Sequence, residues 1–206
     1  MLVRGALGYA LFCVGGATLA FTGGRYALGE WRQAEARQSW DEAEARAVVA
    51  LARRTSAAGH DSAPILNGAP VARLLIPRLG LDEIVLEGVD GDELNAGPGH
   101  LPGSAFPGER GNAIISAHRD RHFARLGEIH MGDTVVTESG AHRARWIVIA
   151  RRVIDADAPA LFRTKDPTLT LTTCWPIRYT GSAPERLLVT AKLIGATGSF
   201  ASVATN

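Results

Sequence analysis

The sequence predicts an all-β domain, either a β-barrel or a sandwich, preceded by a helical N-terminal region. From about Ala69 onward, short apolar runs alternate with glycine and proline breaks and show little helical period, which is typical of strands joined by turns. Residues 31–54, in contrast, contain neither glycine nor proline and are rich in alanine, glutamate, arginine and glutamine, all good helix formers. With 206 residues, the chain is long enough for one domain and its appendages.

The charge balance and the cysteines narrow the class of protein. Lysine and arginine number 22, and aspartate and glutamate number 21, so the formal net charge is +1 and gives no electrostatic reason to expect nucleic-acid binding. The only two cysteines, Cys13 and Cys174, lie near opposite ends of the chain and do not make a disulfide framework. Cys174 is therefore expected to carry a free thiol.

An uncharged stretch, Gly5–Gly24, lies near the start of the chain. At about 1.5 Å per residue, a helix of this length just crosses a hydrocarbon core of about 30 Å. We expect an uncleaved single-pass anchor. The alternative is a cleaved signal peptide, because Thr18-Leu19-Ala20 resembles a small-x-small cleavage site. Arg4 precedes the stretch and Arg25 follows it, so charge alone does not set its orientation.

The helical stretch 31–54 has two interpretations. At roughly 36 Å it is long enough to act as a stalk that lifts a domain off a membrane, and the alternative is a solvated helix packed on the domain. Residues 57–64 are interpreted as a linker, and the small, polar residues from Gly195 onward as a flexible tail. The predicted organisation is a membrane anchor or signal peptide at 1–29, a helical stalk and linker at 30–68, a β-barrel domain at 69–194 and a tail at 195–206.

Seven segments of the domain have the character of short strands. In chain order they read VARLLIP, EIVLEGV, NAIISAH, DTVVTE, RWIVIARRVI, LTLTTC and RLLVTAKLI. Residues 96–111, rich in glycine and proline, form a long connection between the second segment and the third.

Alternation along the last two segments predicts where their polar side chains point. Side chains alternate between the two faces of a strand. Cys174 therefore falls on the face opposite the leucines of its own strand, and Arg186 falls on the face opposite the apolar run that begins at Leu187. If the apolar faces point into a barrel, Cys174 and Arg186 lie on its outer wall, and the chemistry is expected in a surface groove. The face of His118 is left open, and a β-bulge would reverse any of these assignments.

Cys174, His118 and Arg186 form the candidate set for chemistry. A cysteine needs thiolate character to act as a nucleophile, and a neighbouring imidazole or guanidinium supplies it. His118 ends a strand and is followed by a natural turn, which distinguishes it among the six histidines. Arg186 is a candidate for stabilising charge on a tetrahedral intermediate or for holding a substrate carbonyl. Its alternative role is a surface ion pair with Glu185 or Asp157.

Other histidines compete with His118. His122 is the main competitor, and His100, in a Gly-Pro-Gly-His loop, is the next. His118, His122 and Cys174 are also a conceivable zinc set, but no CxxC or HExxH spacing supports one, so no metal site is expected.

Read together, the motifs resemble those of sortases. TLTTC at 170–174 looks like the TLxTC motif of that family, and ERLLV at 185–189 looks like the strand that carries its arginine. GNAIISAHRD at 111–120 resembles the strand that ends in the catalytic histidine. The resemblance covers roughly 71–193, and the ordered set of histidine, TLxTC and arginine is highly specific.

The surroundings of the motifs refine the resemblance. Trp175-Pro176 after the cysteine, and the long loop to Arg186, are similar to class D-like sortases, including those of Gram-negative proteobacteria. Two departures stand next to the histidine. Ser116-Ala117 replaces the common Ala-Gly before it, and Arg121-His122 replaces a Thr-Phe-type pair after it.

The resemblance implies a sortase-like eight-stranded β-barrel with short helices, preceded by an N-terminal transmembrane helix and a helical stalk. It also implies a cysteine transpeptidase. Cys174 would attack the Thr–Gly-type bond of an LPXTG-like signal near the C-terminus of a substrate protein, and an amine acceptor would release the thioacyl-enzyme. His118 would exchange protons with the leaving and incoming amines. Arg186 would position the substrate and stabilise the oxyanion, and Thr173 would contribute to the oxyanion or substrate site.

Location and cofactors follow from the same resemblance. The chain is expected in the bacterial cytoplasmic membrane, with its catalytic domain on the extracytoplasmic or periplasmic side, and without a cofactor; a dependence on calcium is left open. Two alternatives remain, a cysteine hydrolase with water as the acceptor and a membrane-tethered binding module without activity. The L,D-transpeptidases are excluded because their Ser-x-Gly-Cys context is absent.

Overall fold

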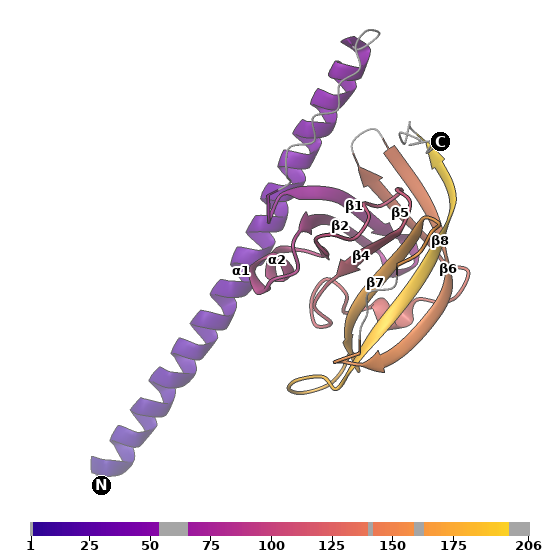
Figure 1. Cartoon of the computed structure of the whole chain (residues 1–206). Coiled ribbons are helices and arrows are strands. Elements are labelled where there is room, and N and C mark those ends of the chain that lie inside the picture. Colours follow the sequence, from indigo (N-terminus) through magenta and orange to yellow (C-terminus); the bar gives the residue numbers. More distant parts are fainter. Residues whose placement is uncertain (1, 54–65, 140–141, 159–162, 198–206) are drawn as a thin grey trace.

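A computed structural model describes residues 2–53, 66–139, 142–158 and 163–197. Its helices and strands follow one another in the order α1 (Leu2–Arg53), β1 (Pro70–Ile76), η1 (Pro77–Leu79), β2 (Leu81–Glu87), α2 (Gly91–Ala96), β3 (Gly99–His100), β4 (Asn112–Ser116), η2 (Leu126–Glu128), β5 (Thr134–Ser139), β6 (His142–Asp155), β7 (Thr168–Trp175) and β8 (Glu185–Thr197). Figure 1 shows the strands gathered into one body, with α1 running along its side.

The strands close into a barrel in the order β1-β2-β3-β4-β7-β8-β6-β5. This confirms the predicted eight-stranded β-barrel. All seven strands expected from the sequence are present, and the eighth is β3, whose two residues lie within the predicted Gly- and Pro-rich connection. Two neighbouring pairs are parallel, β2 with β3 and β4 with β7. The β4–β7 pairing places the strand that leads to His118 directly beside the strand that carries Cys174.

The barrel interior holds the main hydrophobic core. Leu169 and Leu171 of β7 and Leu187 and Val189 of β8 are at most 1 % exposed and belong to this core, as the alternation of these strands predicts. Trp146 of β6 is fully buried among them, and its indole N–H donates to the hydroxyl of Thr137 at 2.9 Å. A buried tryptophan thus fills the barrel without leaving its one donor unpaired.

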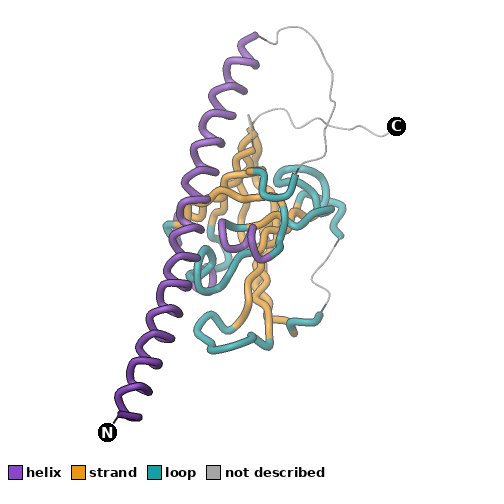
Figure 2. Tube along the Cα trace, turned by 90° about the vertical axis from the view of Figure 1, so that its left-hand side faces the viewer, coloured by secondary structure: helices purple, strands orange, loops and turns teal. Residues whose placement is uncertain are grey.

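Helix α1 packs on the outside of the barrel through its middle section. Ala36 and Trp40 of α1 form a second buried cluster with Ile84, Leu86 and Ala96. Figure 2 shows the helix along one side of the strands, extending past them at both ends. For residues 31–43, the interpretation as a helix packed on the domain therefore describes the structure better than a free stalk.

A buried glutamine fixes this packing. The side-chain amide of Gln33 donates to the carbonyl oxygens of Ala96 and Ile84 at 3.0 and 3.3 Å, and its oxygen accepts from the N–H of Ile84 at 2.8 Å. These bonds satisfy a polar side chain that is only 4 % exposed. They set the axial position of α1 against β2 and α2.

Three further expectations concern the predicted transmembrane helix, the linker and the C-terminal tail. Within the part of the chain that is described, no helix is long and apolar enough to span a membrane, so the predicted transmembrane helix is not supported. The predicted linker, 57–64, lies outside the described residues. The predicted tail begins too early, because Gly195, Ala196 and Thr197 pair with β6 as the end of β8.

A buried histidine ties β2, β3 and the following loop together. His100, the alternative catalytic histidine, is 1 % exposed and faces Glu87 across the parallel β2–β3 pair. Its Nδ1 lies 2.7 Å from Glu87 Oε2, and its Nε2 lies 2.9 Å from the carbonyl oxygen of Ala105 and 2.9 Å from the hydroxyl oxygen of Ser104. The ring stacks on Phe106 with centroids 4.7 Å apart. His100 therefore has a structural role in holding β2, β3 and the following loop together.

We predict that Glu87→Ala destabilises the barrel by about 2 kcal/mol, because it leaves the Nδ1 of a buried imidazole without its partner. The measurement is the free energy of unfolding from chemical denaturation. The control is Glu30→Ala, which removes an exposed carboxylate of α1 and should change the unfolding free energy little. Equal stabilities of the two variants would contradict a structural role for the Glu87–His100 pair.

Candidate active site

Cys174 and Arg186 are direct neighbours on the outer wall of the barrel. They are register partners in the antiparallel pair of β7 and β8, and both are exposed. Opposed residues of an antiparallel pair have Cβ atoms about 4.5–5.5 Å apart and project from the same face. The thiol and the guanidinium, twelve residues apart in the sequence, therefore face solvent side by side.

His118 lies beside β7 on the side opposite β8, at the height of Cys174 along the strand. Ser116 of β4 is the register partner of Thr172, and the N–H of Ala117 donates to the carbonyl oxygen of Thr172 at 3.2 Å. His118 and Cys174 each follow this pair by two residues. Ala117 is part of the barrel core, and His118, the next residue, is half-buried. Because β4 ends at Ser116, the outer side is where His118 lies if the alternation of this strand continues for two more residues.

The side chain of Thr173 is buried, whereas the resemblance implied a part in the oxyanion or substrate site. Its side chain is 3 % exposed, and its hydroxyl donates to the carbonyl oxygen of Ala117 at 2.7 Å. The side chain therefore does not share the outer face with Cys174. Instead, it binds β7 to the residue that precedes His118, so its hydroxyl holds the histidine and the cysteine in register.

Thr173→Val should loosen this link. Valine keeps the shape but leaves the carbonyl of Ala117 without its buried donor, which is expected to cost about 1–3 kcal/mol of unfolding free energy. Thr173→Ser keeps a hydroxyl and should lose much less. Chemical denaturation of both variants checks the prediction, and a valine variant as stable as the serine variant would contradict it.

Arg186 is held by the chain that precedes β7. Its Nε donates to the carbonyl oxygen of Ala156 at 3.1 Å. Within the described residues its guanidinium makes no ion pair, neither with Glu185 nor with Asp157. The guanidinium is thus oriented by a neutral acceptor and keeps its full charge for an incoming group.

Arg119 is a site residue that the sequence reasoning passed over as part of a turn. Its guanidinium donates to the carbonyl oxygens of Pro176, Tyr179 and Gly181, at 3.3, 3.0 and 2.7 Å. It also lies 5.6 Å from the centre of the Tyr179 ring. One side chain next to His118 therefore fastens the loop that runs from Cys174 to β8.

The pKa of His118 lies below its ordinary value. Burial lowers it most, Asp120 opposes this shift, and His122, Arg121 and Arg25 lower it further. Because the lowered pKa disfavours the charged form, the neutral ring predominates near pH 7, and the ring is charged at equilibrium only at more acidic pH. A neutral imidazole is a proton acceptor.

Asp120→Asn should lower the pKa of His118 further, because it removes the carboxylate that favours the charged ring. His122→Gln should move the pKa in the opposite direction. Histidine NMR over a pH series measures both. A pKa that rises in Asp120→Asn would contradict this electrostatic account of the loop.

His122 points to a different partner from Cys174. Its Nδ1 lies 3.5 Å from Oε1 of Glu83 on β2. Across the residues that the structure describes, no group of three His, Cys, Asp or Glu side chains is arranged to hold a metal ion. His60, in the predicted linker, lies outside the described residues.

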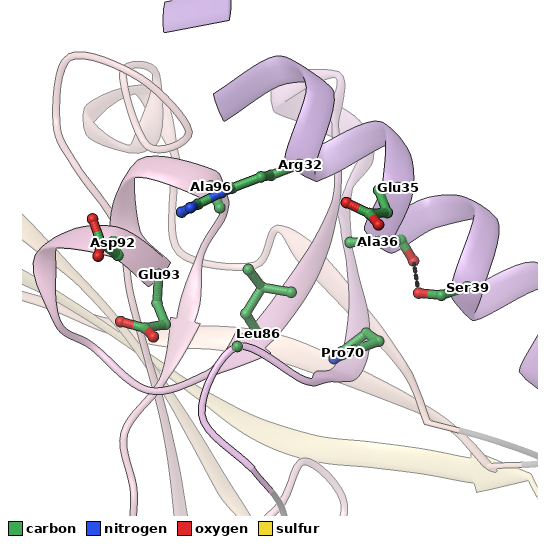
Figure 3. A pocket seen from close by; sticks show the side chains of 10 residues that line it. Arg32, Glu35, Ala36, Ser39, Pro70, Leu86, Asp92, Glu93 and Ala96 are labelled. Atoms are coloured by element: carbon green, nitrogen blue, oxygen red, sulfur yellow. Dashed lines mark hydrogen bonds between the residues drawn. The ribbon is translucent and has the colours of Figure 1, made fainter. Parts of the chain in front are cut away.

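A well-formed pocket lies away from this site. A pocket of about 380 Å³ lies between α1 and α2, and none of its lining residues is Cys174, His118 or Arg186. Figure 3 shows Arg32 of α1 extending toward Ala96 of α2, with Asp92 and Glu93 of α2 farther from α1 than Ala96. The cysteine, by contrast, stands on an open surface, which suits an extended polymer better than an enclosed small molecule.

Comparison with known families shows where the chain belongs. The sequence model of the sortase domain matches residues 74–194, more than half of the chain. The chain belongs to the sortase family. This confirms the resemblance seen in the motifs, and the matched range contains His118, Cys174 and Arg186.

Individual relatives agree with a class D-like sortase. Sortase D of Bacillus subtilis is 32% identical over 123 residues, which cover 59% of the chain and 62% of Sortase D. The chain therefore spans less than two thirds of the length of that relative. The catalytic domain of B. anthracis SrtD is 30% identical, with a TM-score of 0.57 over 70% of the chain and 100% of that domain.

The fold of this sortase is shared more widely than its sequence. A Clostridium perfringens Sortase D5 transpeptidase superposes with a TM-score of 0.63 at 23% identity, covering 82% of the chain and 99% of that structure. Such a match shows the same barrel.

Proposed function

We propose that this sortase is a cysteine transpeptidase that cleaves a sorting signal through a thioacyl-enzyme and passes the acyl group to an amine. The observation that carries the proposal is the position of Cys174, exposed at the barrel surface, opposite Arg186 on one neighbouring strand and level with His118 beside the other. Acyl transfer needs a nucleophile, a proton carrier and a fixed cation close together, and these three residues supply them on one part of the barrel surface.

The steps follow from the roles that these three groups can take. Neutral His118 accepts the proton of the Cys174 thiol, and the thiolate attacks the scissile carbonyl carbon. The carbonyl oxygen becomes an oxyanion, which the guanidinium of Arg186 stabilises. His118 then protonates the leaving amine, and the C–N bond breaks to leave a thioester on Cys174.

In the second half of the reaction, these steps run in reverse with a new amine. His118 removes a proton from the incoming amine, which attacks the thioester, and the Cys174 sulfur leaves as the thiolate and regains its proton. The substrate that we propose is a protein with an LPXTG-like signal near its C-terminus, and the proposed site of action is outside the cytoplasm.

A cysteine hydrolase differs only in the acceptor. Water in place of the amine would give the free acid, and the open position of Cys174 admits either. We favour transfer because the sequence matches the sortase domain throughout the barrel.

The proposal is tested by incubating the entire chain with a library of Leu-Pro-containing peptides and a strong amine nucleophile. We expect an amine-ligated peptide, absent with His118→Ala. Release of the free acid alone, at every amine concentration, would favour the hydrolase.

A further inference from the structure

Helix α1 reaches the loop that carries the catalytic histidine. In this His118 loop (residues 118–123), the N–H groups of Arg121 and Phe123 both point to the carbonyl oxygen of His118, at 3.3 and 3.1 Å. The side chain of Phe123 is fully buried in the barrel core, whereas that of Arg121 extends toward α1 and α2. A shift of Arg121 would therefore move the peptide of His118.

Arg121 joins the His118 loop to both helices. Its Nη1 donates to the carbonyl oxygen of Asn95 on α2 at 2.8 Å, and its Nη2 to that of Tyr26 on α1 at 3.2 Å. The guanidinium carbon lies 4.2 Å from the centre of the Tyr26 ring, and the Tyr26 hydroxyl donates to the carbonyl oxygen of Asp120 at 3.3 Å. We call Arg121, Tyr26, Asn95 and Asp120 the Arg121 clamp.

A glycine lets α1 come close enough for the clamp to form. A Cβ on Gly29 would lie 2.5 Å from Arg121 Nη2 and 2.5 Å from the carbonyl oxygen of Asn95. The second of these atoms is backbone and cannot move aside by itself. Gly24, earlier in the same helix, has open space around its Cβ position. The close approach is therefore specific to the point where α1 meets the clamp.

The electrostatics of His118 also depend on α1. After burial, which is the largest cause, positive charges lower the pKa of His118, and one of them is Arg25 of α1. The other charged groups that act on the ring, Asp120, His122 and Arg121, belong to its own loop. Docking of α1 thus changes both the surroundings and the charge near the ring.

We propose that α1 is a positioning element of the catalytic site, and that Arg121 is the positioning residue through which α1 holds the His118 loop. This deepens the proposed function, on which the role of His118 rests. It follows that the barrel alone, residues 70–197, lacks a support of its proposed catalytic histidine.

The test uses the entire chain with labelled histidine. We compare Gly29→Ala and Arg121→Lys, neither of which changes a charge, with the matched control Gly24→Ala. In the first two variants, the pKa of His118 measured by NMR should rise toward its ordinary value of about 6.5, and in the control it should stay at the wild-type value. In the transfer assay, kcat of the first two should fall on the order of tenfold, with KM little changed.

An unchanged His118 titration in both Gly29→Ala and Arg121→Lys would overturn the proposal, as would an equal shift in Gly24→Ala. If Gly29→Ala fails to fold, Arg121→Lys carries the test alone. The titration needs no turnover, so the two proposals are tested separately. A chain that transfers no peptide counts against the proposed function, whereas the NMR titration decides whether the clamp positions His118.

Discussion

Cys174→Ala should reduce peptide cleavage and transfer to background, a loss on the order of 10⁴-fold or more in kcat, because the proposed acyl intermediate forms on this thiol. The side chain is exposed at the barrel surface, so the unfolding free energy should change little. The measurement is the initial rate of peptide cleavage with saturating amine.

The chain offers a matched control for this variant. Cys13 is the other free cysteine and is exposed on α1. Cys13→Ala should keep the wild-type rate. A Cys174→Ala variant that retains substantial activity would show that the chemistry does not pass through this thiol.

Arg186→Lys should lower kcat on the order of 10²–10³-fold, the range seen when one donor to an oxyanion is removed. Lysine keeps the charge but not the planar fork, and it cannot both donate to Ala156 and present further donors in a fixed direction beside Cys174. The measurement is steady-state kinetics, in which KM should change less than kcat because the interaction is made mainly in the transition state.

An exposed arginine elsewhere on the barrel provides the comparison. Arg145 of β6 pairs with Gly195, far along β8 from Arg186. Arg145→Lys should leave kcat and KM unchanged. Equal kinetics for the two lysine variants would mean that Arg186 takes no part in the reaction.

The strand pattern predicted a β-barrel or a sandwich, the resemblance to sortases selected the barrel, and side-chain alternation placed the nucleophile on its outer wall. Apolar residues recur at every second position of β7 and β8, so Leu169 and Leu187 could be assigned to the core and Cys174 and Arg186 to the wall. Strand β3 was missed because two residues carry no period. His100 looked like a loop histidine because its partner, Glu87, lies on another strand.

The residues that hold the loops of the site in place could not be predicted from the sequence, because their partners are also distant in the chain. Arg119 meets Tyr179 sixty residues away, and Tyr26 meets Asp120 across ninety-four. Such contacts depend on how strands and helices close on one another, and no local pattern indicates them. Thr173 shows a related effect, because its place in a motif suggested a catalytic part, whereas its hydroxyl donates to the backbone of Ala117.

The most direct test of the mechanism is the covalent state of Cys174 during turnover. The entire chain is mixed with a cleaved library peptide, quenched in acid and examined by intact mass spectrometry, with the modified residue located by proteolysis. The mechanism predicts an added acyl mass on Cys174 that disappears when amine is supplied and does not form in Cys174→Ala. Peptide cleavage without any acyl adduct on Cys174 would contradict it.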